Sequence, residues 1–235
     1  MAVESGLEAA EFDLAVTPLR DVNAALHAIE DSSPRHWRVL NPRGAHALAV
    51  GIDAPIEVEI EGHAGYYCAG MNKQATVRVH GNVGVGCAEN IMSGSVIVDG
   101  NASQSAGATG RGGLVVIRGS AAARCGISMK GVDIVVQGSV GHMSGFLAQK
   151  GTLVICGDAG EALGDSIYEA HLYVRGTVAD LGADCVEKEL RAEHVAQVTE
   201  LLSLAGIEGV DPASFRRYGS ARQLYNFHVD HAGAY

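Results

Sequence analysis

The cysteines and histidines of this chain are the residues that could bind metal or carry redox chemistry. The five cysteines are Cys68, Cys87, Cys125, Cys156 and Cys185. None belongs to a CxxC pair, the usual spacing for zinc and iron–sulfur ligands. The ten histidines are scattered, and their densest group is His228-x-Asp230-His231. The chain has an internal repeat of 19 residues, described below, and the histidines stand at different positions within it. We therefore expect no site in which several histidines bind one metal ion.

Glycine-rich stretches such as residues 81–86, GNVGVG, invite comparison with phosphate-binding loops. Such loops cradle phosphates when a helix follows them, but no helical pattern follows here and no GxxxxGK[ST] sequence occurs. Residue 2 is alanine, so removal of Met1 would not expose the cysteine that an N-terminal-nucleophile amidotransferase needs. The sequence therefore predicts no catalytic, cofactor-binding or metal-binding residue in this chain.

An internal repeat of 19 residues fixes the position of many glycines. The repeat glycines are Gly62, Gly81, Gly100, Gly119, Gly138, Gly157 and Gly176. Four and two residues before each one the side chain is aliphatic, with more polar residues between, as in Val77-Arg78-Val79. This alternation is typical of a strand with one buried face. Alanine or glycine stands seven residues after each repeat glycine, which predicts a corner that needs small residues and a permissive φ.

These repeats predict an all-β fold, a parallel β-helix with about 19 residues per coil and about seven coils. Each repeat is too short for a strand–helix unit of about 30 residues. It also has too few strand residues for a propeller blade of about 40. The five prolines lie outside the repeats, where a missing N–H breaks no ladder. Cys68 and Cys87 share one phase, so we expect neighbouring buried thiols, with a metal or redox pair as the alternative.

The two ends of the chain do not follow the repeat. We divide the chain into an N-terminal extension with one capping helix (1–43), the β-helix (44–182), and a C-terminal helix with an aromatic and arginine-rich tail (183–235). The first helix is expected to begin at Thr17-Pro18 and to run to about residue 31. The second is expected over 186–205, with Gly206 as its stop. Because β-helix ends are open sheet edges, we expect both flanks to cover them.

An apolar stripe is expected on the outer wall of the middle coils. It consists of Ile97, Val116, Val135 and Val154. A monomer would not leave such a stripe in water, so either the terminal helices or another subunit must cover it. Another outward-facing position of the repeat, close to the stripe, is occupied by Lys73, Arg111 and Lys130. Lys150 lies one residue away from this position in its own coil. These basic residues are either solvated or guide an anion or a partner.

The C-terminal tail is the second candidate partner surface, because aromatic residues and arginine are enriched in interface cores. Its candidate residues are Arg216, Arg217, Tyr225 and Phe227. The alternative is that the tail folds back onto the chain's own coils.

Composition limits the partners and the compartment. A formal net charge of −10 argues against nucleic-acid binding, which needs a basic face. No apolar run reaches the length of about 18 residues that a membrane span needs. The acidic start MAVESGLEAAEFD lacks a signal-peptide core. We therefore expect a cytoplasmic protein with neither a membrane nor a nucleic-acid partner.

The motif G-xx-G-xxx-G occurs intact at residues 138–145 (GSVGHMSG) and 157–164 (GDAGEALG). On this motif, roughly residues 15–235 resemble the GXGXG family, the C-terminal right-handed β-helix domain of the glutamate synthase large subunit. The terminal YGSARQLYNFHVDHAGAY and the helix that begins at Thr17-Pro18 are most similar to the stand-alone β-helix subunit of N-methylglutamate synthase.

This resemblance implies a scaffold subunit of a hetero-oligomeric enzyme, without catalytic residues of its own. The complex would convert glutamate and methylamine to N-methylglutamate and ammonia, as part of methylamine metabolism. It implies two partners, a glutaminase-like amidotransferase chain and an FMN-binding synthase chain, with the FMN and an iron–sulfur cluster expected on a partner. Two alternatives remain open: the β-helix scaffold chain of a formylmethanofuran dehydrogenase, and a homo-oligomeric structural β-helix without an enzyme partner.

Overall fold

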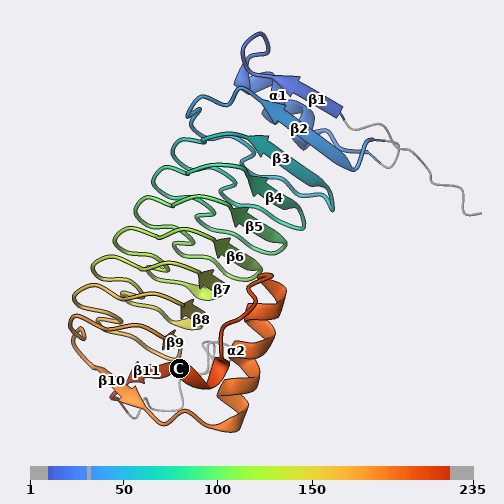
Figure 1. Ribbon diagram of the computed structural model, residues 1–235. Helices are drawn as coiled ribbons and strands as arrows, with labels where there is room; N and C mark the ends of the chain where they lie inside the picture. The colour runs from blue at the N-terminus through green and yellow to red at the C-terminus, as the bar shows by residue number, and fades with distance from the viewer. Residues whose placement is uncertain (1–9, 31–32, 223–235) are drawn as a thin grey trace, which may run out of the picture.

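The computed structural model describes residues 10–30 and 33–222, which form a rod of stacked coils with one long sheet along its side (Figure 1). The sheet has 11 strands in the order β1-β2-β3-β4-β5-β6-β7-β8-β9-β11-β10. Each strand from β1 to β8 pairs in parallel with the next along the chain. The strands of this parallel part are β1 (Ala10–Asp13), β2 (His36–Leu40), β3 (Glu57–Glu61), β4 (Thr76–Val79), β5 (Ser95–Val98), β6 (Leu114–Ile117), β7 (Lys130–Val136), β8 (Lys150–Ile155) and β9 (His171–Val174). The predicted all-β parallel β-helix is confirmed.

Strand pairing keeps the 19-residue repeat in register. Val58 pairs with Val77 and Val77 with Val96, and the same spacing continues to Leu172 on β9. These aliphatic side chains are buried inside the coils, as the alternation predicts. The first coil is longer, because Trp37 pairs with Val58, 21 residues later. Strand β2 therefore adds one rung ahead of the regular repeats.

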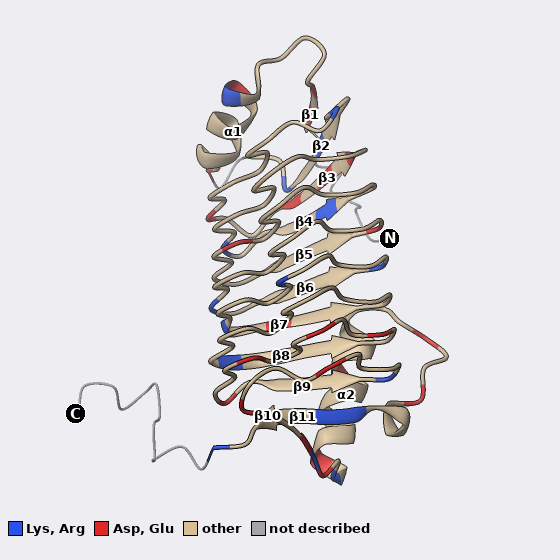
Figure 2. Cartoon of the chain, turned by 90° about the vertical axis from the view of Figure 1, so that its left-hand side faces the viewer, with Lys and Arg blue, Asp and Glu red and all other residues tan. Residues whose placement is uncertain are grey.

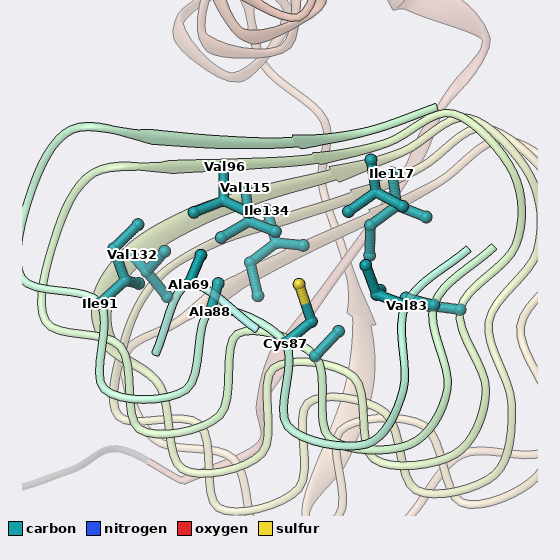
Figure 3. Close-up of a cluster of buried hydrophobic side chains, with 14 of the residues drawn as sticks. Ala69, Val83, Cys87, Ala88, Ile91, Val96, Val115, Ile117, Val132 and Ile134 are labelled. Atoms are coloured by element: carbon teal, nitrogen blue, oxygen red, sulfur yellow. The ribbon is translucent and has the colours of Figure 1, made fainter. Parts of the chain in front are cut away.

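A second wall faces the sheet across the interior of the coils. It consists of single-residue parallel bridges that join Ala64, Val83, Ala102, Ala121, Val140, Ala159 and Val178 on successive coils. Cys87 points into the space between the walls, where Val96 and Ile117 come from the sheet and Val83 from the second wall (Figure 3). Because each coil buries a similar set of side chains, one apolar core runs along the rod.

The repeat glycines are required because adjacent coils approach closely at this point. A Cβ placed on Gly119 would lie 2.7 Å from the carbonyl oxygen of Gly100, and one on Gly138 would lie 2.6 Å from that of Gly119. Of the seven repeat glycines, only Gly62 has φ in the left-handed region. The permissive φ occurs seven residues later, as predicted, for example at Ala88 (φ 55°). The two small positions of the repeat therefore have different causes, one steric and one conformational.

Side chains next to the repeat glycines form a ladder along the rod. The Asn82 Oδ1 accepts from the Asn101 backbone N–H over 2.8 Å, and the Asn101 Oδ1 accepts from Ser120 over 2.8 Å. Ser120 Oγ continues the ladder by accepting from the Ser139 N–H over 3.1 Å. These bonds tie each coil to the next at the corner where the backbones touch.

Helix α1 (Leu19–His27) covers the N-terminal end of the core (Figure 1). Val22 and Leu26 are buried there. Asn23 fixes the helix to the first coil, because its side chain donates to one backbone carbonyl over 2.7 Å and accepts from one N–H over 2.9 Å. The helix has Pro18 as its N-cap, one residue later than expected, and ends earlier than expected.

The C-terminal flank corrects the prediction of one helix over 186–205. Strand β10 (Cys185–Lys188) takes the first part of that range, because it pairs antiparallel with β11 (Arg216–Ser220), which in turn pairs with β9. Helix α2 (Ala192–Leu204) follows, and a short 3-10 helix, η1 (Pro212–Ser214), leads to β11. The predicted stop is confirmed: Gly206 has φ 63°, and the Ile207 N–H reaches back to the Leu202 carbonyl over 2.9 Å.

The two flanks cover different parts of the rod. Strands β11 and β10 cover the C-terminal edge of the sheet, whereas α2 lies along its outer face and not over its end (Figure 1). The expectation that the C-terminal flank covers the sheet edge is confirmed, and it is the strands of this flank, not its helix, that do so. No helix within 10–30 and 33–222 has the length and apolarity to cross a membrane.

Candidate functional site

Helix α2 covers the apolar stripe on the outer face of the sheet. Val116, Val135 and Val154 are at most 1% exposed and share one apolar cluster with the helix. The helix residues of this cluster are Val198, Leu201 and Leu202. Ile97, at the far end of the stripe, is only partly buried. The chain's own helix therefore occupies most of the surface that the sequence offered to a partner.

A polar clasp beside this apolar contact joins α2 to β8 and β9. Gln197 donates to the Thr152 hydroxyl over 3.0 Å and accepts from the Tyr173 hydroxyl over 2.8 Å. The His171 Nδ1 lies 3.2 Å from the same Gln197 oxygen. His194 packs edge-on against His171, with ring centroids 5.8 Å apart. Two histidines therefore meet, contrary to the expectation from their phases, because α2 folds back onto the sheet.

Two adjoining pockets of about 370 and 330 Å³ share Glu169 and His171 in their linings. Asp133 lies in the first, where burial raises the pKa of its carboxyl although hydrogen bonds with Thr152 oppose the shift. Burial lowers the pKa of His171, so its ring is neutral at pH 7. Sequence reasoning missed this site, yet Asp133, Thr152 and His171 are one repeat apart, which was the available signal.

The C-terminal arginines lie on β11, which folds back against β9. Arg216 donates to a backbone carbonyl of the last coil over 2.9 Å, and its guanidinium lies 5.8 Å above the Tyr218 ring. Arg217 lines the second pocket, and its Nε is buried without a hydrogen-bond partner among the residues described. Over 216–220 the tail thus packs on its own coils. Outside the described residues lie Tyr225, Phe227 and the His228-x-Asp230-His231 group.

Basic residues on three adjacent coils form a column, hereafter the basic column: Arg111, Lys130 and Lys150. Lys130 and Lys150 are the first residues of β7 and β8 and are partners in the ladder, just before a shift of its register. Figure 2 shows Lys and Arg positions, in blue, on the left-hand side of the rod at the level of these two strands. All three are exposed, and none forms an ion pair within the described part of the chain. Lys73, two coils before Arg111 in the same phase, instead pairs with Asp53 over 2.7 Å. Like charges on neighbouring strands repel, so the basic column is a local cost to stability.

Charges of opposite sign alternate on the open N-terminal half of the sheet. Arg38 bonds to Glu61 over 2.9 Å, and the His80 Nδ1 lies 2.9 Å from an Asp99 carboxylate oxygen. Glu59, Glu61 and His80 also place three potential ligand atoms within 4.8 Å of one another. Because Arg38 already neutralises Glu61, this arrangement is an ion-pair network and not a built metal site. Glu61 and His80 are 19 residues apart, one full repeat, and this spacing alone could have predicted that they lie side by side on adjacent coils.

The cysteines are free and buried. Cys68 and Cys87 occupy equivalent places on adjacent coils, as predicted, and the N–H that follows Cys87 donates to the Cys68 carbonyl over 2.9 Å. Burial raises the pKa of Cys68 and of Cys125 to about 12, and that of Cys87 well above its usual range. Metals bind the thiolate, so a thiol with so high a pKa is a poor ligand. These values favour buried thiols over a metal or redox pair.

Comparison with known proteins identifies a relative of nearly the same length. This chain is 62% identical over 224 residues to the protein GlxC of Rhizobium meliloti (strain 1021). The match covers 95% of this chain and 98% of the relative. No protein-family model matches the chain. At this identity the two chains share one fold, including both flanks of the β-helix.

Proposed function

Because this chain belongs to the GlxC family, we propose that it is the β-helix subunit of a multi-subunit, glutamate synthase-like enzyme. In this role it holds other chains at a fixed separation and supplies no catalytic residue. The observation that carries the proposal is the uninterrupted stack of coils from β2 to β9. The backbone of each coil is hydrogen-bonded to the next coil, and its apolar side chains pack against those of the next coil. A rod of this kind is suited to spacing two active sites. The G-xx-G-xxx-G repeats, which resemble those of the glutamate synthase β-helix domain, support the choice of enzyme class.

We further propose that the complex is an N-methylglutamate synthase, in the cytoplasm. A glutaminase-like chain and an FMN-binding chain are its partners, and FMN and an iron–sulfur cluster reside on a partner chain. The reaction joins glutamate and methylamine and releases ammonia. Support for this finer assignment comes from the similarity of both chain ends to the stand-alone β-helix chain of that enzyme.

The basic column is the surface that we assign to partner docking. Its three exposed cations stand on adjacent coils, whose backbones lie about 4.8 Å apart, and have no acidic partner among the described residues. In a chain with a net charge of −10, unpaired like charges are retained at a cost to the fold. An acidic surface of a partner would neutralise them, and would do so only in the complex.

Co-purification tests the assembly. The tagged chain is co-expressed with a glutaminase-like and an FMN-binding chain, isolated under native conditions, and studied by flavin absorbance and by an assay with glutamate and methylamine. Recovery of a flavoprotein that forms N-methylglutamate supports the proposal. Recovery of the tagged chain alone contradicts the scaffold role, and a flavoprotein complex that does not use methylamine contradicts the substrate.

A matched pair of charge reversals tests the docking surface. The double variant Lys130→Glu/Lys150→Glu is expected to lower recovery of a partner by about tenfold at moderate salt, because attraction becomes repulsion. The control Lys73→Glu changes the same phase of the repeat at a site already paired with Asp53, and is expected to leave recovery unchanged. Equal recovery with the double variant and the control rules out the basic column as the docking surface.

A further inference from the structure

We propose that the two adjoining pockets between α2, β9 and β11 together bind a small amino acid. The carboxylate of this ligand lies against Arg217 and Lys188, and its ammonium group faces Asp133 and Glu169. The ligand thereby bridges the C-terminal helix, the last coil of the β-helix and the returning strand.

The carboxylate end is marked by a guanidinium whose hydrogen bonds are not all made. The Arg217 Nε is buried without a partner among the described residues, one terminal nitrogen lies 3.5 Å from the Glu189 carbonyl, and the side chain also interacts with the Tyr173 hydroxyl. Leaving a buried donor unpaired is costly, and a carboxylate satisfies a guanidinium through two parallel bonds. Lys188, in the same pocket, has no ion-pair partner within the described chain, whereas Arg222 is already paired with Asp184. Arg217 and Lys188 are therefore the cations of the second pocket that remain available to a ligand, and Lys150 is the cation of the first.

The ammonium end is marked by two acids that form no ion pair within the described chain, although Lys150 of the basic column lines the same pocket. Asp133 and Glu169 line the first pocket, and neither forms an ion pair with any described residue. Asp133 is half-buried, which raises the pKa of its carboxyl. A ligand ammonium group supplies the missing positive charge. The Thr152 hydroxyl, in the same lining, offers it a further oxygen acceptor.

His171 connects the two ends. It lines both pockets, so the cationic and anionic ends belong to one continuous site. Burial is the main cause that lowers the pKa of this histidine. The charge of Arg217 lowers it further, whereas that of Asp133 raises it. The His171 ring therefore lies between the positive charge of Arg217 and the negative charge of Asp133. Because the ring is neutral, it neutralises neither group.

The walls of the site are held in place before a ligand arrives. Gln197 is bonded to Thr152 over 3.0 Å and to Tyr173 over 2.8 Å, and Arg217 pairs in register with Tyr173 through the β9–β11 ladder. Such preorganisation lowers the entropic cost of binding. The two volumes, about 370 and 330 Å³, are of the size that accommodates small molecules.

A series of ligands with increasing charge separation tests the proposal. The ¹⁵N-labelled full-length chain is titrated with glycine, β-alanine and 4-aminobutyrate, and with acetate and methylammonium as single-charge controls. The Gly219 and Ser220 amides, which line the second pocket, serve as local NMR reporters. Because rigid strands fix the distance between the two ends, one amino acid is expected to bind at least about tenfold tighter than either control.

Variants identify the carboxylate end. Arg217→Met is expected to weaken binding of the preferred amino acid by at least about tenfold, and Arg217→Lys, which keeps the charge but loses the fork, by a smaller factor. The matched control is Arg216→Met on the same strand, expected to change the affinity less than about twofold because that side chain is used by a backbone carbonyl and Tyr218. Acetate that binds as tightly as every amino acid, or the absence of any shift up to about 50 mM ligand, overturns the proposal. Unchanged affinity in a folded Arg217→Met protein overturns it as well.

Discussion

Replacing Gly119 by alanine tests whether the repeat glycines are required by the close approach of adjacent coils. A Cβ at Gly119 would lie 2.7 Å from the carbonyl oxygen and 2.9 Å from the carbonyl carbon of Gly100. It would also meet the side-chain oxygen of Asn101, which accepts the ladder bond from Ser120. The backbone cannot move away without stretching the bond from the Gly119 N–H to the Gly100 carbonyl, now 2.9 Å. Overpacking of this kind costs about 1–3 kcal/mol of unfolding free energy.

The matched control is Gly219→Ala in β11. The nearest atoms to a Cβ there are at 3.8 and 3.9 Å, which is ordinary contact. Both substitutions restrict the unfolded chain, which stabilises the folded protein by about 0.4–1 kcal/mol in each case. The difference in Tm between the two variants therefore isolates the overpacking cost, which corresponds to about 2–12 °C in a chain of this size.

The assay is thermal unfolding followed by circular dichroism, with urea unfolding as a check on cooperativity, because coil stacks can unfold in steps. Equal Tm values for Gly119→Ala and Gly219→Ala would refute the steric explanation. The glycine would then have to be explained by backbone conformation, although its φ lies outside the left-handed region.

Three further predictions concern groups whose pKa is shifted by burial. Burial raises the pKa of Asp133, so its ionised form opposes folding at neutral pH. We expect Asp133→Asn to raise Tm at pH 8 by on the order of 2 °C, with the gain absent at low pH; a lower Tm at pH 8 contradicts this. Burial lowers the pKa of His171, so the folded state favours the neutral ring. The stability that this preference supplies is fully present above about pH 6.5 and is lost as the pH falls through the folded-state pKa. Urea unfolding at pH 7.5 and 5.5 should show this loss, and His171→Gln should reduce it; an equal loss in the variant assigns the dependence to other groups. Burial raises the pKa of Cys68 to about 12, so a thiol reagent at pH 8 is expected to modify it only after unfolding in urea; rapid modification in the native protein shows that the thiol is accessible.

The strands were predictable because their signal is local and repeated. Val77 and Val79 alternate with polar residues, and the same pattern recurs 19 residues later, so both the buried face and the register follow from the sequence. The pairing of Cys68 with Cys87 follows from the same arithmetic. By contrast, the range 186–188 has a helical pattern but forms part of β10, since its hydrogen-bond partners come from β11, far along the chain. Local propensity is overridden where a distant strand supplies a ladder.

The candidate ligand site shows the same division. Asp133, Thr152 and His171 lie in one phase, so their alignment on adjacent coils is contained in the spacing. Gln197 and Arg217 reach them only because α2 and β11 fold back onto the sheet, and no spacing along the chain encodes that return. The sequence could not predict what covers the apolar stripe, for the same reason. The repeat places Val135 on the outer face, and this position is the same whether a helix or a partner covers it.

The sequence by itself determined the parallel β-helix, its 19-residue coil, its apolar interior and the places where only small residues fit, because each of these depends on contacts between equivalent residues of successive coils. The tertiary structure alone decided what the flanks do: α1 covers one end, β11 and β10 cover the other sheet edge, and α2 lies on the outer face. The physical reason is that a repeat specifies its neighbours, whereas a flank without a repeat finds its place by burying whatever apolar face and unpaired edge the coils leave exposed.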